Sequence, residues 1–337
     1  MTDKDGRSRA GNEPVTDRLE APHRRPTEGA RVVERTTVLL YRGGSWLLAR
    51  LPARPAWLVI GWFTRASYLL WPTKRRWSNA NFGYVLGKPP GSPAVRRLAL
   101  RAYATYARYL VELMRLPRLT QSQAATLVDG DGLDGVEHYW KTSRGVILVI
   151  CHVGNNEVVC AGVAERGWPI SVVADDSAFP ELFEILRRQR ESWGAHVIPW
   201  RNLREVFGVL RRHELLALLV DWGYRDDGIP VRLFGAWTTL PAGPAALAAK
   251  TGATILPIAI RRQANDHFLV ELDQAINVPS SNPADLQRAS QAVADALERI
   301  ISAAPDQWYS FKPMWPATAA ESEALAARAE RMAGNLK

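Results

Sequence analysis

Six apolar residues stand together from Val146 to Cys151, with no polar residue among them, and His152 follows directly. An uninterrupted apolar run of this length is typical of a strand that is covered on both faces of a sheet. The Gly-Asn-Asn sequence at 154–156 then offers turn and N-cap chemistry for a helix. The pattern therefore predicts a buried strand that ends at a histidine, with Glu157 in the first turn of the helix that follows.

The rest of the chain repeats this pattern of short apolar runs and amphipathic segments. Further strands are predicted at residues 170–174, 196–199, 215–220, 255–260 and 268–272, with helices between most of them. Alternating strands and helices predict an α/β fold with a mainly parallel central sheet and helices on both faces. Open sheets of this kind bind ligands at the carboxyl ends of their strands, which is where His152 is expected.

Composition divides the 337 residues into four parts. Residues 1–35 are rich in charge, proline and glycine, and we expect a disordered polar tail without a signal peptide. Residues 36–77 hold two apolar blocks, each too short to span a membrane. Four tryptophans and the basic run at 74–76 predict an amphipathic helical segment in the interface of an anionic membrane, with two ordinary core helices as the alternative. Residues 78–316 form the α/β domain, and 317–337 a C-terminal helix.

The net charge of +9 indicates an anionic partner, which could be nucleic acid, anionic lipid or the phosphates of a nucleotide-containing thioester. Thirteen tryptophans favour lipid, because the indole suits a membrane interface. The chain has no recognised nucleic-acid-binding motif. Two cysteines, Cys151 and Cys160, give no disulfide framework and favour a reducing compartment, so we expect the protein to face the cytosol.

His152 and Glu157 form a candidate catalytic pair. Five positions of a continuous helix would turn the two side chains about 500° apart, so they can meet only if the chain bends between them. A strand end followed by the turn at 154–156 provides that bend, which would let Glu157 orient a general base. Backbone N–H groups at the helix N-terminus could stabilise an oxyanion. A packed histidine with a purely structural role is the alternative.

At 152–157, His-Val-Gly-Asn-Asn-Glu resembles the His-x-Gly-Asn-Trp-Glu/Asp signature of the bacterial lipid A lauroyl/myristoyl acyltransferase family, whose actinobacterial branch contains the phosphatidylinositol mannoside acyltransferases. The resemblance runs from about Thr37 to Trp315. It includes the basic run at 187–190, Phe234-Gly235, the small-residue segment at 241–253 and the aromatic segment at 305–315. Asn156 stands where the family has Trp, and Gly223 replaces the second acid of an Asp-x-Asp motif that begins at Asp221.

The resemblance implies a peripheral enzyme at the cytoplasmic face of the cell membrane. It would transfer a long acyl chain from acyl-CoA or acyl carrier protein to a hydroxyl of a glycolipid such as a phosphatidylinositol mannoside, without cofactor or metal. His152 would be the base and Glu157 its partner. The candidate substrate-binding residues are Asp175, Asn155, Asp221, Arg187, Arg190, Trp308 and Trp315. Several of these residues also have a structural alternative. Asp175 could cap a helix, the arginines could lie on a solvated helix face, and the tryptophans could pack in the core.

The sequence is also compatible with other functions. The acceptor could be lipid A or a lysophospholipid. A metal-dependent hydrolase could use His152 and Glu157 with Cys151, Cys160 or His196, although no His-x3-His or Cys-x2-Cys spacing supports it. A non-catalytic lipid-binding or nucleic-acid-binding protein would explain the basic and aromatic composition but not the His152 motif.

Overall fold

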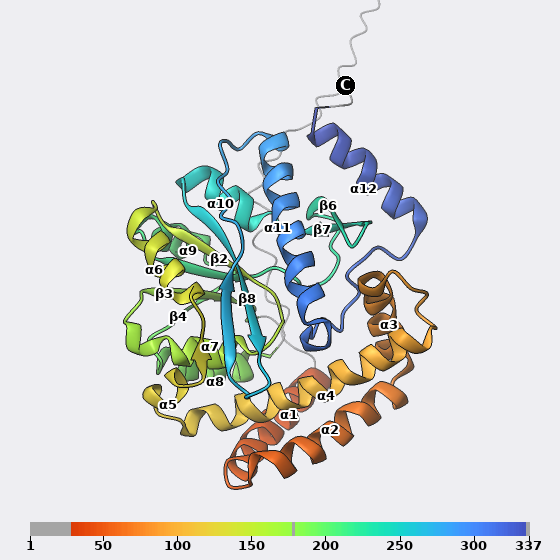
Figure 1. The fold of residues 1–337 in the computed structure, drawn as a ribbon, viewed down its shortest axis with the longest axis vertical. Coiled ribbons are helices and arrows are strands. Elements are labelled where there is room, and N and C mark those ends of the chain that lie inside the picture. Colours follow the sequence, from red (N-terminus) through yellow and green to blue (C-terminus); the bar gives the residue numbers. More distant parts are fainter. Residues whose placement is uncertain (1–27, 177–178, 335–337) are drawn as a thin grey trace, which may run out of the picture.

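The computed structural model describes residues 28–176 and 179–334 and has a seven-stranded sheet at its centre (Figure 1). Its strands lie side by side in the order β1-β9-β8-β2-β5-β3-β4. They are β1 (Val128–Asp129), β2 (Val146–Ile150), β3 (Ile170–Ala174), β4 (His196–Pro199), β5 (Leu215–Leu219), β8 (Thr254–Arg262) and β9 (Phe268–Leu272). Every neighbouring pair is parallel except β8 and β9, which confirms the predicted mainly parallel sheet.

Strand β2 lies between β8 and β5 and is covered on both faces, as its uninterrupted apolar sequence predicts. Ile147 and Val149 point into one hydrophobic cluster and Val146 and Leu148 into another. Helices α9 (Leu203–Arg211), α10 (Gly243–Thr251) and α11 (Pro283–Ala303) contribute to the first cluster. Helices α6 (Gly132–Thr142) and α7 (Asn156–Gly162) contribute to the second, with α5 (Gln121–Ala125) and α8 (Pro180–Glu191) on the same side.

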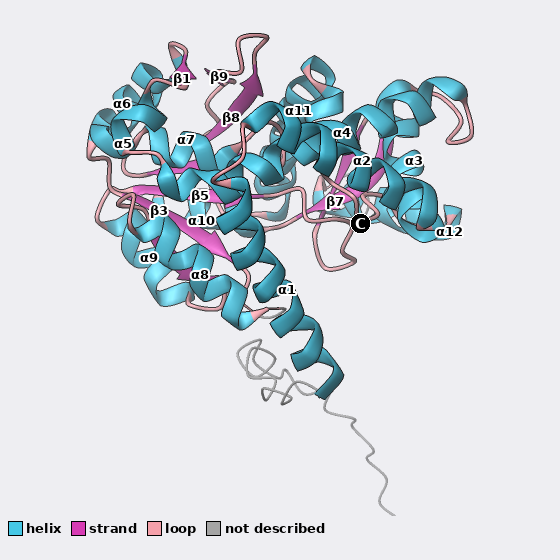
Figure 2. Ribbon diagram, turned by 90° about the horizontal axis from the view of Figure 1, so that it is seen from below, coloured by secondary structure: helices cyan, strands magenta, loops and turns pink. Residues whose placement is uncertain are grey.

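The N-terminal part of the described chain is helical. It comprises α1 (Glu28–Leu48), α2 (Ala53–Leu70), α3 (Pro72–Leu86) and α4 (Pro93–Arg115). The expectation of a disordered tail is therefore wrong for residues 28–35, which belong to α1, whereas residues 1–27 lie outside the described part. Helices α1 and α2 pack on α4: Leu48 and Ala56 share a cluster with Val111, and Tyr68 contacts Tyr103. Figure 2 shows the beginning of α1 extending beyond the α/β body.

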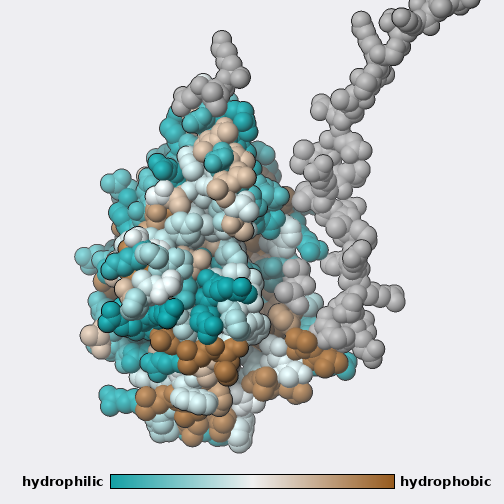
Figure 3. Space-filling model, turned by 90° about the vertical axis from the view of Figure 1, so that its right-hand side faces the viewer, coloured by the Kyte–Doolittle hydropathy of each residue, from teal (hydrophilic) through white to brown (hydrophobic). Residues whose placement is uncertain are grey.

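Helices α1 and α2 leave most of their large apolar side chains exposed. Trp46, Trp62 and Trp71 are 61%, 66% and 58% exposed, so these three tryptophans do not pack in a core. Leu39, Leu40, Leu47, Leu58, Val59, Phe63, Leu69 and Leu70 are exposed beside them. Figure 3 shows apolar residues gathered over the lower part of the face it presents, at the level of α1 and α2 in Figure 1. In the described ranges, no helix combines the length and apolar character needed to span a membrane.

A two-stranded antiparallel sheet, β6 (Ile229–Leu233) and β7 (Ala236–Leu240), was not predicted. Its two-residue turn is Phe234-Gly235, and both residues have positive φ angles, 50° and 75°. This is the geometry of a hairpin turn that matches the twist of its strands. Helix α11 and the C-terminal helix α12 (Ala319–Met332) cover the hairpin. Only Gly235 in this turn carries an obvious sequence signal, because phenylalanine rarely adopts a positive φ.

Gly154 fixes the path of the chain directly after β2 and His152. Its φ is +70°, and a Cβ at this position would overlap the carbonyl oxygen of Ile260 in β8. Gly167 also has a positive φ, +63°, but a Cβ there would have no atom within 4 Å. The two glycines thus share a backbone conformation and differ in the space around them.

We expect Gly154→Ala to be much more destabilising than Gly167→Ala. The positive φ alone should cost about 1–2 kcal/mol in both variants. The overlap with Ile260 should add about 1–3 kcal/mol in Gly154→Ala, because the buried strand cannot move away freely. Urea unfolding of both variants measures the difference. Equal free energies of unfolding would show that the approach of Gly154 to β8 is not a constraint.

Candidate active site

His152 forms a hydrogen-bonded pair with Asp221. The two residues follow β2 and β5, which are neighbouring parallel strands in which Ile150 lies opposite Leu219. The distance from His152 Nδ1 to Asp221 Oδ1 is 2.6 Å, and the backbone N–H of His152 donates to Asp221 Oδ2 over 2.9 Å. The His152 side chain is 31% exposed and that of Asp221 only 1%. One ring nitrogen of His152 is thus engaged with a buried carboxylate, which leaves Nε2 for a substrate.

Within the described ranges Glu157 forms no hydrogen bond with His152, so the predicted contact within the pair is not seen. Its carboxylate lies against Arg190 of α8: the Arg190 Nε is 3.2 and 3.1 Å from its two oxygens, and Nη2 is 2.5 Å from Oε1. These side chains are only 11% and 15% exposed. The bend at 154–156 exists, but it turns Glu157 toward a buried guanidinium that needs a counter-charge. Glu157 acts on His152 only through its charge, which raises the pKa of the imidazole.

Asn155 caps helix α7 and is completely buried. Its Oδ1 accepts hydrogen bonds from the backbone N–H groups of Glu157 and Val158, both over 3.2 Å, and its Nδ2 donates to Glu112 over 2.8 Å. Two of the N–H groups expected to stabilise an oxyanion are therefore already used, because both donate to the cap Asn155. Asn156, at the family's Trp position, donates to the Cys151 carbonyl over 3.2 Å and steadies the same turn.

The charges around the pair tune both pKa values. Burial lowers the pKa of His152, but the charge of Asp221 and its hydrogen bond outweigh this and raise the pKa above 6.5, against the opposing charge of Lys312. Burial raises the pKa of Asp221, but its contacts with His152 and the indole N–H of Trp308 hold it below the usual value. At neutral pH Asp221 is ionised, and His152 is a stronger base than free imidazole.

Neither cysteine is available as a nucleophile or as a thiolate ligand. Burial and the charge of Glu157 raise the pKa of Cys160 to about 12, and burial with the charge of Asp221 raises the pKa of Cys151 well above its usual value. Because Glu157 is also committed to Arg190, the predicted alternative of a metal site loses its main ligands. Within the described ranges, no group of three or more His, Cys, Asp or Glu side chains is placed to hold a metal ion.

The remaining predicted residues fall into two groups. Trp308 belongs to the site: it is fully buried, and its indole N–H donates to Asp221 Oδ2 over 2.9 Å. Asp175 is exposed and follows β3, at the edge of the sheet where β2 and β5 also end. Arg187 instead pairs with Glu184 and Glu191 on its own helix. Trp315 packs elsewhere, with its indole N–H on the Leu233 carbonyl and its ring stacked on Tyr84.

Gly223 stands where the family has a second acid, and the contacts of the two nearby acids, Asp226 and Asp227, do not show that either replaces it. Asp227 pairs with Arg225 over 2.9 Å, and both side chains are about two-thirds exposed. The carbonyl of Asp226 accepts a hydrogen bond from Arg328. Gly223 has a φ of +107°, and a Cβ there would lie 3.1 Å from the Pro313 carbonyl oxygen. The substitution therefore suits the close approach of the segment that carries Trp308.

Trp222, Lys312 and Asn81 were missed by the sequence analysis. The Trp222 ring meets His152 edge-on with centroids 5.5 Å apart, and Lys312 Nζ lies 4.8 Å from the Trp222 ring centroid. Asn81 of α3 is buried and holds the aromatic segment by donating to the carbonyls of Ser310 and Lys312. The backbone N–H of Tyr309 in turn donates to the His152 carbonyl over 2.8 Å. In the sequence, the one indication of these contacts around His152 is the tryptophan that directly follows Asp221.

An apolar cavity of about 100 Å³, here called the sheet pocket, lies against β2, β5 and α7. Asn156 and Glu157 are among its lining residues, so it adjoins the turn that follows His152. A second cavity of about 260 Å³ lies beside it. Four residues line both cavities and form the wall between them: Cys160, Val163, Trp168 and Ile170. Trp168 is the largest member of this wall and is 8% exposed.

Comparison with known proteins agrees with this geometry. Residues 27–316 match the family model described as bacterial lipid A biosynthesis acyltransferase. The chain belongs to this family. It is 28% identical to proteins named phosphatidylinositol mannoside acyltransferase from Mycobacterium tuberculosis, strains H37Rv and CDC 1551, over 88% of this chain and 94% of theirs. A relative of the same name from Mycolicibacterium smegmatis is also 28% identical, over 70% of this chain and 77% of its own. The protein is therefore an acyltransferase, with an acyl donor and a lipid or glycolipid acceptor.

Replacing Asp221 should lower the pKa of His152. In Asp221→Asn, burial still disfavours the imidazolium, but the carboxylate charge that opposes burial is gone. The shift should be smaller in Glu157→Gln, because Glu157 makes no hydrogen bond to the ring, and absent in Asp227→Asn. Titration of the His152 ring protons by NMR measures all three. A larger shift in Glu157→Gln than in Asp221→Asn would restore the original assignment of the pair.

Proposed function

We propose that this acyltransferase moves a long fatty acyl chain from acyl-CoA or acyl carrier protein to a hydroxyl of a glycolipid such as a phosphatidylinositol mannoside. The main support is the His152–Asp221 pair at an accessible edge of the sheet, with an apolar pocket that adjoins the next turn. The names of the mycobacterial relatives support the acceptor class. Asp175 is exposed at the same edge, and a carboxylate is a suitable acceptor for the hydroxyls of a sugar.

In the proposed reaction His152 Nε2 takes the proton of the acceptor hydroxyl while the hydroxyl oxygen attacks the thioester carbonyl carbon. The carbon–sulfur bond then breaks, and the leaving thiolate receives that proton from the imidazolium. Asp221 keeps the ring in one tautomer and orientation and stabilises its charged form. The ammonium of Lys312, whose charge reaches His152, would stabilise negative charge that develops beside the ring. No enzyme nucleophile is needed, which agrees with the raised pKa values of both thiols.

The sheet pocket is the proposed site of the donor's acyl chain. Its lining is apolar apart from the Glu157–Arg190 pair and Asn156 near its beginning, so burial of hydrocarbon there is favourable. A chain in this pocket would leave its thioester near the turn that carries His152. The pocket is closed at the Trp168 wall, which would limit the length of chain that it accepts.

The exposed apolar faces of α1 and α2 support peripheral association with a membrane. Trp46, Trp62 and Trp71 are placed as interfacial tryptophans would be, and Lys74, Arg75 and Arg76 follow on α3. Cytosolic acyl-CoA or acyl carrier protein could then meet a membrane-embedded acceptor at this surface. We therefore place the enzyme at the cytoplasmic face of an anionic membrane.

Transfer of radiolabelled palmitate from palmitoyl-CoA into a total lipid extract tests the reaction. Wild-type protein should produce a labelled lipid, and His152→Ala should reduce its rate by about 10²–10⁴-fold, because general-base catalysis is lost. Asp227→Asn, an exposed change, is the matched control and should keep full activity. Mass spectrometry of the labelled product identifies the acceptor. Undiminished transfer by His152→Ala would contradict the proposed mechanism. The assay is repeated with palmitoyl acyl carrier protein as the second donor.

Trp168→Ala should shift the preferred acyl chain toward greater length. Removing the indole opens the wall between the sheet pocket and the neighbouring cavity, so that a longer chain can bury its end. Competition between acyl-CoA donors of increasing length measures kcat/KM for each. Trp193→Ala, which alters only the neighbouring cavity, is the control. An unchanged preference in Trp168→Ala would place the acyl chain outside the sheet pocket.

A further inference from the structure

A basic groove runs between α2, α4 and the loop that joins β8 to β9. It has a volume of about 780 Å³ and is separate from the residues that contact His152. Five of its lining residues are arginines, here called the arginine groove: Arg54, Arg65, Arg101, Arg108 and Arg262. Two aspartates, Asp266 and Asp306, also line it. The groove therefore carries a formal excess of positive charge.

Most of this positive charge is not neutralised inside the groove. Asp266 is 3.1 Å from Arg108 and 3.8 Å from Arg262. Within residues 28–176 and 179–334, Arg54, Arg65 and Arg101 form no ion pair. Like charges that gather without counter-charges are unfavourable unless an anion or water screens them. The arrangement is typical of a surface that binds a negatively charged group.

Buried donors at the groove give an independent indication. The Arg262 side chain is only 5% exposed, and its Nη2 donates to Glu112 Oε2 over 2.5 Å. In the described part of the chain, Arg262 Nε and Nη1 and the indole Nε1 of Trp57 are buried without a hydrogen-bond partner. Such donors are costly unless something accepts from them. Both residues line the groove, so an anion there could satisfy these donors once their side chains turn toward it.

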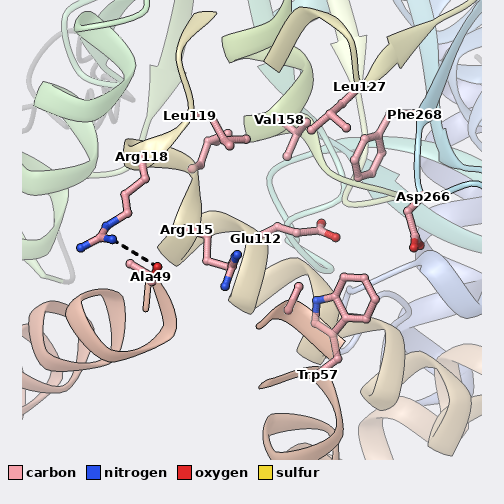
Figure 4. A pocket seen from close by; sticks show the side chains of 12 residues that line it. Ala49, Trp57, Glu112, Arg115, Arg118, Leu119, Leu127, Val158, Asp266 and Phe268 are labelled. Carbon is pink, nitrogen blue, oxygen red and sulfur yellow. Dashed lines mark hydrogen bonds between the residues drawn. The ribbon is translucent and has the colours of Figure 1, made fainter. Parts of the chain in front are cut away.

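A mainly apolar pocket, which Glu112, Arg115 and Arg118 also line, adjoins the groove and indicates which kind of anion fits. This α4 pocket has a volume of about 210 Å³ and shares Trp57 and Asp266 with the groove (Figure 4). Its apolar lining consists mainly of Leu116, Leu119, Leu127, Val158 and Phe268. Figure 4 shows Phe268, Val158 and Leu127 on one side of the pocket and Trp57 opposite. A ligand that fills both spaces has a phosphate and a hydrocarbon chain side by side.

We propose that the arginine groove and the α4 pocket form a binding site for an anionic phospholipid, separate from the catalytic centre. The phosphodiester would bind Arg65, Arg101 and the free donors of Arg262, and one acyl chain would enter the α4 pocket past Trp57. Guanidinium groups match phosphate oxygens well. The site rests on the membrane association in the proposed function. A nucleotide phosphate would explain the groove but not the apolar pocket.

The site is also connected to the catalytic turn. Glu112 accepts hydrogen bonds from Arg262 and from Asn155, the cap of the helix that follows His152. A phosphate bound to Nε and Nη1 of Arg262 would bear on the same guanidinium whose Nη2 donates to Glu112, and so on the setting of that cap. Lipid bound at the membrane would in this way be sensed next to the catalytic residues.

Binding of short-chain dihexanoyl-phosphatidylglycerol to the whole protein tests the proposal. The reporter is the indole N–H resonance of Trp57, assigned by its loss in Trp57→Phe. The ligand should shift this resonance, because an acceptor reaches the indole. Arg65→Gln with Arg101→Gln should weaken binding by about 25-fold, at about fivefold per arginine. The matched control is Arg96→Gln with Arg97→Gln, two exposed arginines of α4 outside the groove, which should bind as wild type.

Three outcomes would overturn the site. If the control variant bound the lipid as weakly as the groove variant, general surface charge would explain the binding. If adenosine 3′,5′-bisphosphate shifted the Trp57 indole resonance as much as the lipid does, the groove would be a nucleotide site. Saturable binding that leaves the Trp57 resonance unmoved would place the lipid elsewhere. Because none of these measurements uses turnover, they are independent of the palmitate assay. Failure of acyl transfer with intact lipid binding would count against the proposed reaction alone.

Discussion

The buried carboxylate of Asp221 organises the active site. It accepts hydrogen bonds from the ring and the backbone of His152 and from the indole of Trp308. The backbone carbonyl of Asp221 accepts a further hydrogen bond from the Ser310 hydroxyl. An ionised carboxylate in such a place is tolerated only with this many donors. The requirement explains why two neighbouring strand ends and the C-terminal aromatic segment meet at one point. It also fixes which nitrogen of His152 faces solvent.

The helix after His152 is held from two sides by buried ion pairs. Glu157 on the helix pairs with Arg190 of α8, and Glu112 of α4, paired with Arg262, receives the side chain of its cap Asn155. Breaking such a pair leaves an unpaired buried charge, at a cost of about 3–5 kcal/mol. These contacts hold the turn that carries His152 in place. Glu157 contributes to them through Arg190, whereas its place in the family signature predicted direct contact with the histidine.

Local sequence patterns predicted most of the sheet but could not predict its side-chain partners. The strands at 170–174, 196–199 and 268–272 have the predicted bounds, because apolar periodicity is a local property. The contact of His152 with Asp221 joins residues 69 positions apart and depends on β2 and β5 being neighbours. Nothing in the spacing reveals that order. Glu157 was favoured because it is close in sequence, and the buried charge of Arg190, which decides its orientation, is visible only in the fold.

The fold divides the arginines into two groups that the sequence does not distinguish, those paired with a carboxylate and those without one. Arg187 and Arg188 are satisfied by Glu184 on their own helix, and Arg190 by a buried glutamate. In the arginine groove, by contrast, three of the five arginines form no ion pair within the described ranges. Two N–H donors of Arg262 are also buried there without a hydrogen-bond acceptor. Net charge therefore does not show where an anion binds. The location follows from where several arginines gather with few carboxylates beside buried, unsatisfied donors, and this combination occurs in the arginine groove, next to the exposed apolar face of α2.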